Sequence, residues 1–233
     1  MTQAQKAERF RALHAAGAFI LPNAWDAASA RILEDAGFSA IATTSAGIAF
    51  ACGFPDGERL PRDMMVEAIG RIASAVRVPV TADIERGYGA TPDDVADTVS
   101  AVIAAGAVGV NLEDGTGDPE HPLIAVDRMV ARIEAASATA ETAGIGFVIN
   151  ARTDGYISGA TGEPAFADAV ARANAYLAAG ADCAFVPWVQ DLGVIRRLAA
   201  SIAGPLNVVV SGPGMPPLKD LEAAGAASRL AAA

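Results

Sequence analysis

Two carboxylates follow an apolar run in residues 78–89, VPVTADIERGYG. The run is rich in β-branched residues and predicts a buried strand, in which side chains two positions apart point to the same side. Asp83 and Glu85 should therefore project together from the C-terminal end of this strand into a glycine-rich turn. Two adjacent negative charges need a compensating partner, and oxygen ligands with little imidazole or thiolate around them suit a hard cation, Mg²⁺ or Mn²⁺.

Further polar residues stand at the ends of three other apolar runs. Ser45 ends the second run, Glu113 and Asp114 end the fourth, and Arg152 and Asp154 end the fifth. If the strands are parallel, these ends meet on one rim, where barrel enzymes place their active sites. A guanidinium among carboxylates is suited to binding a carboxylate substrate, whereas Asp114 and Asp154 are better suited to capping or supporting roles.

The composition excludes several kinds of chemistry. The formal net charge is -10, and the 17 lysines and arginines are scattered, so a nucleic-acid-binding role is not expected. Lys6 and Lys219 are the only lysines, and neither ends a predicted strand, which disfavours Schiff-base and pyridoxal chemistry. His14 and His121 are the only histidines, too few for a histidine-rich metal site or a catalytic triad.

The two cysteines and the lengths of the apolar runs indicate the cellular setting. Cys52 and Cys183 are far apart and predict free thiols in a reducing compartment. The N-terminal residues form an amphipathic, charged pattern unlike an export signal, and no apolar run reaches the roughly 18 residues that span a bilayer. We therefore expect a cytoplasmic protein with no membrane partner.

Strand and helix patterns alternate along the chain, as expected for successive βα units around a parallel sheet. Residues 1–17 predict a helix before the first strand. The predicted strands are 18–22, 39–45, 78–85, 108–114, 146–154, 182–187 and 206–212. The predicted helices between and after them are 26–36, 62–75, 92–105, 123–143, 164–179, 189–202 and 216–224.

This pattern predicts one α/β domain over residues 1–233, a TIM-type (β/α)8 barrel with an N-terminal helix. Its eighth βα unit is expected to be incomplete. After Gly225 only AASRLAAA remains, in which ASRLA is a weak strand with no helix behind it. Three explanations stay open: poor closure, a neighbouring chain that covers the gap, or a shortened chain.

Five motifs occur in order at barrel spacing: TSAGIA, GFPDGE, DIERGYG, NLED and NARTDGY. From about residue 8 to residue 226, the chain thereby resembles the isocitrate lyase and phosphoenolpyruvate mutase superfamily. The resemblance implies a Mg²⁺-dependent barrel that acts on small 2-oxo or 2-hydroxy dicarboxylates through an enolate, either cleaving carbon–carbon bonds or moving phosphorus to carbon. It also implies a homo-oligomer, commonly a tetramer in this superfamily.

The resemblance assigns roles to the rim residues. Asp83 and Glu85 match the metal-site acids, and Asp56 and Glu113 match the acids that hold metal-bound waters. Arg152 matches the arginine that binds the substrate and steadies the enolate. The substrate carboxylate would be received by a hydroxyl and backbone N–H groups of a loop formed by Ser45, Ala46 and Gly47.

The segment after the fourth strand, EDGTGDPEHPLIAVDRM, departs from the superfamily pattern. It has neither the cysteine of the isocitrate and methylisocitrate lyases nor the lysine-containing loop of the phosphonomutases. Decarboxylation or hydrolytic cleavage of an oxaloacetate-like acid, or lyase action on an alkylated malate, then remains. His121 on this segment and Tyr88 in GYG are candidate proton donors. The alternatives are that His121 is a solvent-exposed loop residue and that Tyr88 only packs over the rim.

Three functions are therefore open. The first is a Mg²⁺-dependent carbon–carbon lyase or decarboxylase of small dicarboxylates. The second is a phosphonomutase with a divergent loop after the fourth strand. The third is a non-catalytic barrel that binds a ligand, which the unusual C-terminus favours and the intact rim residues disfavour.

Overall fold

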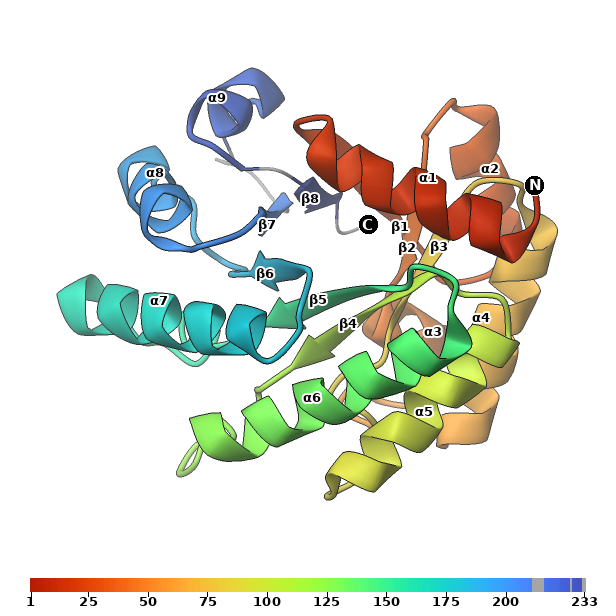
Figure 1. Cartoon of the computed structure of the whole chain (residues 1–233), viewed down its shortest axis with the longest axis horizontal. Helices are drawn as coiled ribbons and strands as arrows, with labels where there is room; N and C mark the ends of the chain where they lie inside the picture. Colours follow the sequence, from red (N-terminus) through yellow and green to blue (C-terminus); the bar gives the residue numbers. More distant parts are fainter. Residues whose placement is uncertain (211–215, 227, 232–233) are drawn as a thin grey trace.

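Eight parallel strands form a closed barrel in sequential order (Figure 1). The computed structural model describes residues 1–210, 216–226 and 228–231. All seven predicted strands are confirmed, although most are shorter than their apolar runs, and residues 211–212 of the last run lie outside the described residues. The strands are β1 (Phe19–Ala24), β2 (Ile41–Thr43), β3 (Val80–Asp83), β4 (Gly109–Glu113), β5 (Val148–Arg152), β6 (Cys183–Phe185), β7 (Leu206–Val210) and β8 (Ser228–Ala231).

Residues 228–231 of the weak ASRLA segment form β8, which closes the ring of strands. Ser228 is in register with Asn207 of β7 on one side and with Phe19 of β1 on the other. Both neighbours are parallel, so the closure is continuous and leaves no sheet edge between β7 and β1. The prediction of an α/β barrel is confirmed. Of the three explanations for the incomplete eighth unit, poor closure is wrong for the strands, because residues 228–231 supply a strand to the barrel.

Helices surround the barrel, and their starts follow sequence signals. Thr91 caps one helix by accepting a hydrogen bond from the Asp94 N–H, with Pro92 at the first helical position. The helices are α1 (Gln3–Ala15), α2 (Ala27–Asp35), α3 (Ser45–Ala51), α4 (Arg62–Ala75), α5 (Pro92–Ala104), α6 (Val126–Ala143), α7 (Gly162–Ala178), α8 (Leu192–Ser201) and α9 (Leu218–Ala223).

The short helix α3 corrects the sequence prediction. Ser45 was expected to end a strand and to begin a loop with Ala46 and Gly47, but β2 ends at Thr43 and α3 begins at Ser45. The Thr44 side chain accepts a hydrogen bond from the Gly47 N–H, so a local cap stops the strand and starts the helix.

One end of the barrel is filled and the other is open. Phe10 of α1 packs with Leu21, Val148 and Val209 from three strands, near the ends at which β4 and β5 begin. Helix α1 therefore covers the N-terminal end of the barrel, as Figure 1 shows. The C-terminal ends of the strands remain available for a site.

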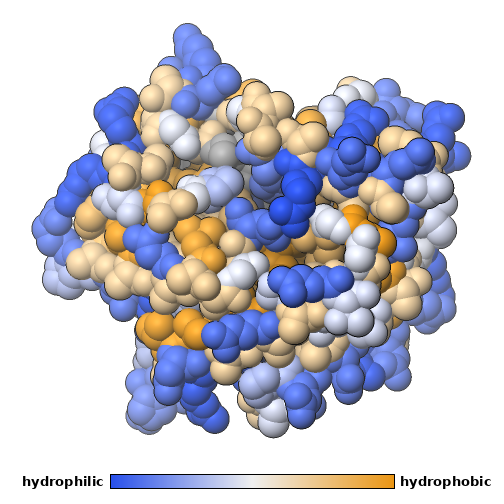
Figure 2. All heavy atoms as spheres, in the orientation of Figure 1, coloured by the Kyte–Doolittle hydropathy of each residue, from blue (hydrophilic) through white to orange (hydrophobic). Residues whose placement is uncertain are grey.

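The surface is mixed in character. Figure 2 shows hydrophilic side chains around the visible face, with hydrophobic ones in small groups between them. Among the described residues, no helix is both long and apolar enough to cross a membrane.

Candidate active site

A cavity of about 430 Å³ opens at the C-terminal rim of the barrel. The loop after β4 contributes Asp118, Pro119 and Pro122 to its wall, and the loop after β5 contributes Ile157 and Ser158. Besides Asp118 and Ser158, its ionisable and hydroxyl lining comes from separate segments of sequence: Ser45, Asp56, Glu85, Arg86, Glu113, Arg152 and Asp154.

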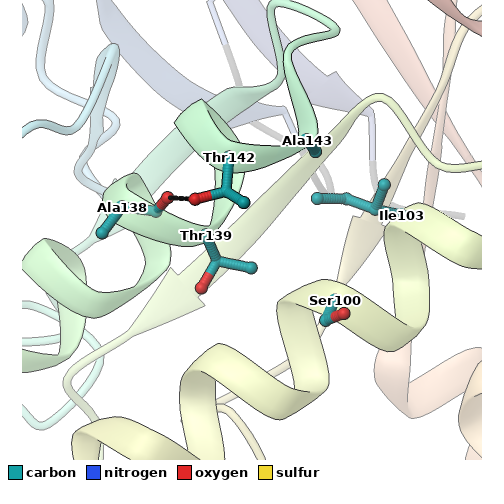
Figure 3. A pocket seen from close by; sticks show the side chains of 6 residues that line it. All are labelled: Ser100, Ile103, Ala138, Thr139, Thr142 and Ala143. Carbon is teal, nitrogen blue, oxygen red and sulfur yellow. Dashed lines mark hydrogen bonds between the residues drawn. The ribbon is translucent and has the colours of Figure 1, made fainter.

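A second cavity, of about 360 Å³, lies between α5 and α6 (Figure 3). Its lining is small and uncharged: Ser100, Ile103, Ala138, Thr139, Thr142 and Ala143. The Thr142 hydroxyl donates to the Ala138 carbonyl of its own helix, at 2.9 Å. With no ionisable side chain in its lining, this groove lacks the groups that catalysis would need, so the rim cavity is the candidate active site.

Ser45 and Thr43 hold Asp83 at the rim. The Ser45 backbone N–H and hydroxyl both donate to Asp83 Oδ2, at 3.1 and 2.8 Å, and the Asp83 N–H donates to Thr43 Oγ1 at 2.9 Å. Ser45 thus orients a carboxylate in this structure, in addition to lining the cavity.

Glu85 lies in a crowded acidic environment. Burial raises its pKa to about 7, and the charges of Asp83, Asp56 and Glu58 contribute to the same shift. Its backbone is left-handed, with φ of 51°, as is that of Tyr88 at 58°. Such conformations are strained for residues other than glycine and occur at functional turns.

Glu58 stabilises this strained turn, a role that sequence reasoning missed. Glu58 Oε1 accepts hydrogen bonds from the Arg86 and Tyr88 N–H groups, at 3.1 and 2.8 Å. Glu58 Oε2 accepts from Arg86 Nη2 at 2.9 Å. The motif GFPDGE contains this residue two positions after Asp56, but no local pattern links it to a turn about thirty residues away.

Arg152 lies between two carboxylates at the end of β5. Its Nη1 is 2.8 Å from Glu113 Oε2, and its Nε and Nη2 donate to Asp154 Oδ1 and Oδ2 at 2.5 and 2.9 Å. The guanidinium also lies 5.6 Å from the Phe185 ring centroid. Burial raises the pKa of Glu113, and the positive charge of Arg152 opposes that rise. Asp154 therefore has the supporting role that its position in the sequence suggested.

The donor set fits a hard cation. Asp56, Asp83 and Glu85 supply only oxygen, and the pKa of Glu85 is raised mainly by burial and further by the charges of Asp83 and Asp56. In the part of the chain that the structure describes, no three ligand-type side chains converge on one point. Mg²⁺ typically takes one or two carboxylates and keeps several waters, so two acids at the end of β3 with further acids around them suit it.

Other predicted site residues lie differently. Tyr88 reaches the site edge, with its hydroxyl 3.5 Å from Glu85 Oε1. His121 is exposed and is not part of the cavity lining; its carbonyl accepts from the Thr116 hydroxyl. Ala46 and Gly47 are also outside the lining, and the Gly47 N–H is bound to Thr44.

The fold and the rim cavity define the class of this protein: an α/β barrel with an acidic, arginine-containing site at the C-terminal ends of its strands. The family model "Phosphoenolpyruvate phosphomutase" matches residues 10–232. The chain therefore belongs to this family, within the isocitrate lyase and phosphoenolpyruvate mutase superfamily, as the motifs predicted.

Individual relatives agree with this assignment and are enzymes of more than one kind. The chain is 32% identical over 196 residues to 2-methylisocitrate lyase of Escherichia coli K12, covering 81% of this chain and 64% of that protein. A solved structure from Burkholderia cenocepacia J2315 has 42% identity and a TM-score of 0.91, covering 98% of this chain and 91% of that one. Phosphonopyruvate hydrolase, solved with oxalate and Mg²⁺, has 28% identity and a TM-score of 0.86, covering 99% and 80%.

Proposed function

We propose that this protein is a Mg²⁺-dependent carbon–carbon lyase or decarboxylase that cleaves a small 2-oxo or 2-hydroxy dicarboxylate through an enolate. The observation that carries the proposal is the charge arrangement of the rim. The Arg152 guanidinium is fixed by Glu113 and Asp154 in the wall of a cavity that also contains Glu85. A fixed positive charge and a divalent cation, which the acids at the rim would hold, are the two elements that enolate chemistry needs.

Asp83 and Glu85 would hold the ion directly, and Asp56 and Glu113 would hold it through waters. Mg²⁺ is the favoured ion, and Mn²⁺ would fit the same oxygen donors. When bound, the metal supplies Lewis acidity to the oxygen at carbon 2 of the substrate. Phosphonopyruvate hydrolase, which was solved with Mg²⁺, supports this assignment by its similarity.

The remaining roles belong to protein side chains. Arg152 would receive the substrate carboxylate and the oxygen on which enolate charge develops. The predicted carboxylate loop is not part of this proposal, because the Ser45 hydroxyl and N–H donate to Asp83 and the Gly47 N–H donates to Thr44. In decarboxylation of an oxaloacetate-like acid, the bond to the distal carboxylate breaks, carbon dioxide leaves, and the electron pair remains in the enolate. Arg152 stabilises that charge more than the neutral precursor.

A proton must then reach the enolate carbon. Of the two donors that the sequence suggested, Tyr88 lies beside Glu85, whereas His121 is exposed. Burial raises the pKa of Tyr88 and so makes its hydroxyl a weaker acid, and the position beside Glu85, not the pKa, is what favours this residue. We therefore assign the donor role to Tyr88.

A phosphonomutase is the second candidate, and membership of the phosphomutase family favours it. The loop after β4 weighs against it, because its residues 114–125 contain no lysine or arginine that could neutralise a moving phosphoryl group. The absence of cysteine from the same residues weighs against isocitrate-type cleavage.

Proton NMR of the purified protein with separate substrates tests these functions. Oxaloacetate, a panel of 2-alkylmalates and phosphonopyruvate are each followed with Mg²⁺ and then with EDTA. Pyruvate from oxaloacetate, or a cleavage product of a 2-alkylmalate, formed above the rate of Mg²⁺ alone and abolished by EDTA, supports the lyase, whereas pyruvate from phosphonopyruvate would show hydrolysis of a phosphorus–carbon bond and would contradict it. Rearrangement of phosphonopyruvate supports the mutase, and no turnover of any compound, with tight Mg²⁺ binding absent, supports the binding protein.

A further inference from the structure

Three side chains behind the rim form a buried cluster that does not line the cavity. Asp114 follows β4 and is 0% exposed, and α7 supplies Arg172 and Tyr176, the latter also 0% exposed. Asp114 Oδ2 accepts hydrogen bonds from the Tyr176 hydroxyl at 2.7 Å and from Arg172 Nη1 at 3.1 Å. The cluster places one negative and one positive charge together, so the buried carboxylate is compensated.

The cluster connects to Arg152 through short contacts. The other oxygen of Asp114, Oδ1, accepts from the Asp154 N–H at 2.8 Å. The Asp154 carboxylate in turn accepts from Arg152 Nε and Nη2. The Asp114 N–H also donates to the Arg152 carbonyl at 3.2 Å. The orientation of Asp114 therefore fixes the backbone from which Asp154 holds the guanidinium.

The same cluster closes the base of the loop at residues 114–125. Arg172 Nη1 donates to the Ile124 carbonyl at 2.9 Å, and the Ile124 N–H donates to the Asp114 carbonyl at 2.8 Å. At Gly115, a side-chain Cβ would collide with the Asp154 carboxylate. The loop base and Asp154 are thus packed too closely to move independently.

We propose that Asp114, Arg172 and Tyr176 are a positioning unit that sets the orientation of the Arg152 guanidinium for ligand binding. The inference rests on the proposed function for its ligand, a small 2-oxo acid or its analogue oxalate. Tyr176 and Arg172 act through Asp114 and Asp154 and touch no substrate. A guanidinium binds a carboxylate through two directed N–H groups, so a small rotation weakens binding while the charge stays in place.

Tyr176→Phe is the main variant, because it removes one hydrogen bond to Asp114 and keeps the ring. Tyr156→Phe is the matched control, since it removes the same hydroxyl from the loop after β5. The readouts are calorimetric affinities for Mg²⁺ alone and for oxalate at saturating Mg²⁺, with thermal unfolding. We expect oxalate to bind about tenfold more weakly to Tyr176→Phe, with Mg²⁺ affinity and the control unchanged.

A second readout does not depend on the ligand. The Arg152 Nε–H signal in a ¹H–¹⁵N spectrum is assigned by its loss in Arg152→Lys, and its chemical shift and solvent exchange report the contact with Asp154. We expect this signal to shift and exchange faster in Tyr176→Phe and Arg172→Met, and less so in Arg172→Lys, which keeps the charge.

The outcomes separate the two proposals. An unchanged Arg152 signal and unchanged oxalate affinity in a destabilised Tyr176→Phe would show that the cluster is merely structural and would overturn the inference. If wild-type protein binds no oxalate with Mg²⁺, the proposed function fails, and the Arg152 signal still decides the positioning role.

Discussion

The charge of Asp83 would serve metal binding, whereas its hydrogen bonds from Ser45 hold the local structure. A substitution that removes the charge and keeps an acceptor oxygen separates these two roles. Asp83→Asn keeps an oxygen for the Ser45 N–H and hydroxyl but removes a charge that raises the pKa of Glu85 and Glu113. We expect activity to be lost and Mg²⁺ affinity to fall by about tenfold or more, with the melting temperature equal to or above that of wild type. The proton NMR assay, calorimetric titration and thermal unfolding measure activity, Mg²⁺ affinity and melting temperature, respectively.

The matched control is Asp97→Asn, which makes the same change at an exposed aspartate on α5, away from the ends of the strands, and should alter none of the three quantities. A collapse of the melting temperature in Asp83→Asn alone would mean that this carboxylate serves the fold, and the metal assignment would then lose its main support.

The Glu58 carboxylate holds the turn at residues 84–89 through its hydrogen bonds to Arg86 and Tyr88. Glu58→Gln keeps one acceptor but removes the charge that pairs with Arg86, so the left-handed Glu85 and Tyr88 lose support. We expect a loss of about 1–3 kcal/mol in the free energy of unfolding and weaker Mg²⁺ binding. Denaturant unfolding and calorimetry measure these. Glu120→Gln, at an exposed glutamate, is the control, and an equal effect in both variants would refute the role.

At the scale of elements, the contact between α1 and β1 should make stability depend on pH. His14 packs edge-on against Phe10 and Phe19, with ring centroids 4.7 and 5.0 Å away, and its Nδ1 is 2.9 Å from the Phe10 carbonyl oxygen. Burial lowers the pKa of His14, which the Asp182 charge opposes and the Arg11 charge favours. The folded state therefore disfavours the protonated ring.

The direction of this pH dependence follows from the linkage between protonation of His14 and folding. The folded pKa of His14 lies below the unfolded value of about 6.5, so its stabilising effect is present above that pH and is lost as pH falls through the folded pKa. We expect acidification from pH 7.5 to 5.5 to reduce the free energy of unfolding more in wild type than in His14→Phe. His121→Gln, at an exposed histidine, should behave as wild type, and equal acid sensitivity of all three proteins would contradict the prediction.

At the scale of the whole molecule, β8 closes the barrel. A variant that ends at Ala226 removes a strand paired to both β1 and β7 and exposes two parallel strand edges. We expect a fall of about 10 °C or more in melting temperature and a tendency to aggregate, measured by thermal unfolding and light scattering. Lys219→Ala, a surface change on α9, should unfold as wild type does. An unchanged truncated protein would show that closure contributes little.

The superfamily resemblance also predicts a homo-oligomer. Large apolar side chains are exposed on α2, on α3 and in the turn after β6: Ile32 at 68%, Phe50 at 65% and Trp188 at 60%. We expect light scattering after gel filtration to give a mass of more than one chain at micromolar concentration. A monomer under those conditions would contradict the prediction.

The sequence by itself determined the order of the strands and of the helices other than α3, and it placed the polar strand ends on one rim of the barrel. Alternation along a strand is a local property, so Asp83 and Glu113 could be assigned to one rim from their positions at strand ends. The helix cap at Thr44 is also a local feature of the sequence. The apolar residues around it fit either a strand or a helix, and α3 was missed for that reason.

Only the tertiary structure decided which residues support the site. Glu58 contacts Arg86 across 28 positions of sequence, and Tyr176 contacts Asp114 across 62. It also decided that β8 forms, because a weak strand gains its hydrogen bonds from two neighbours that are distant in sequence. Such contacts arise when the closed barrel brings loop ends together, and no periodicity or local motif encodes the pairing.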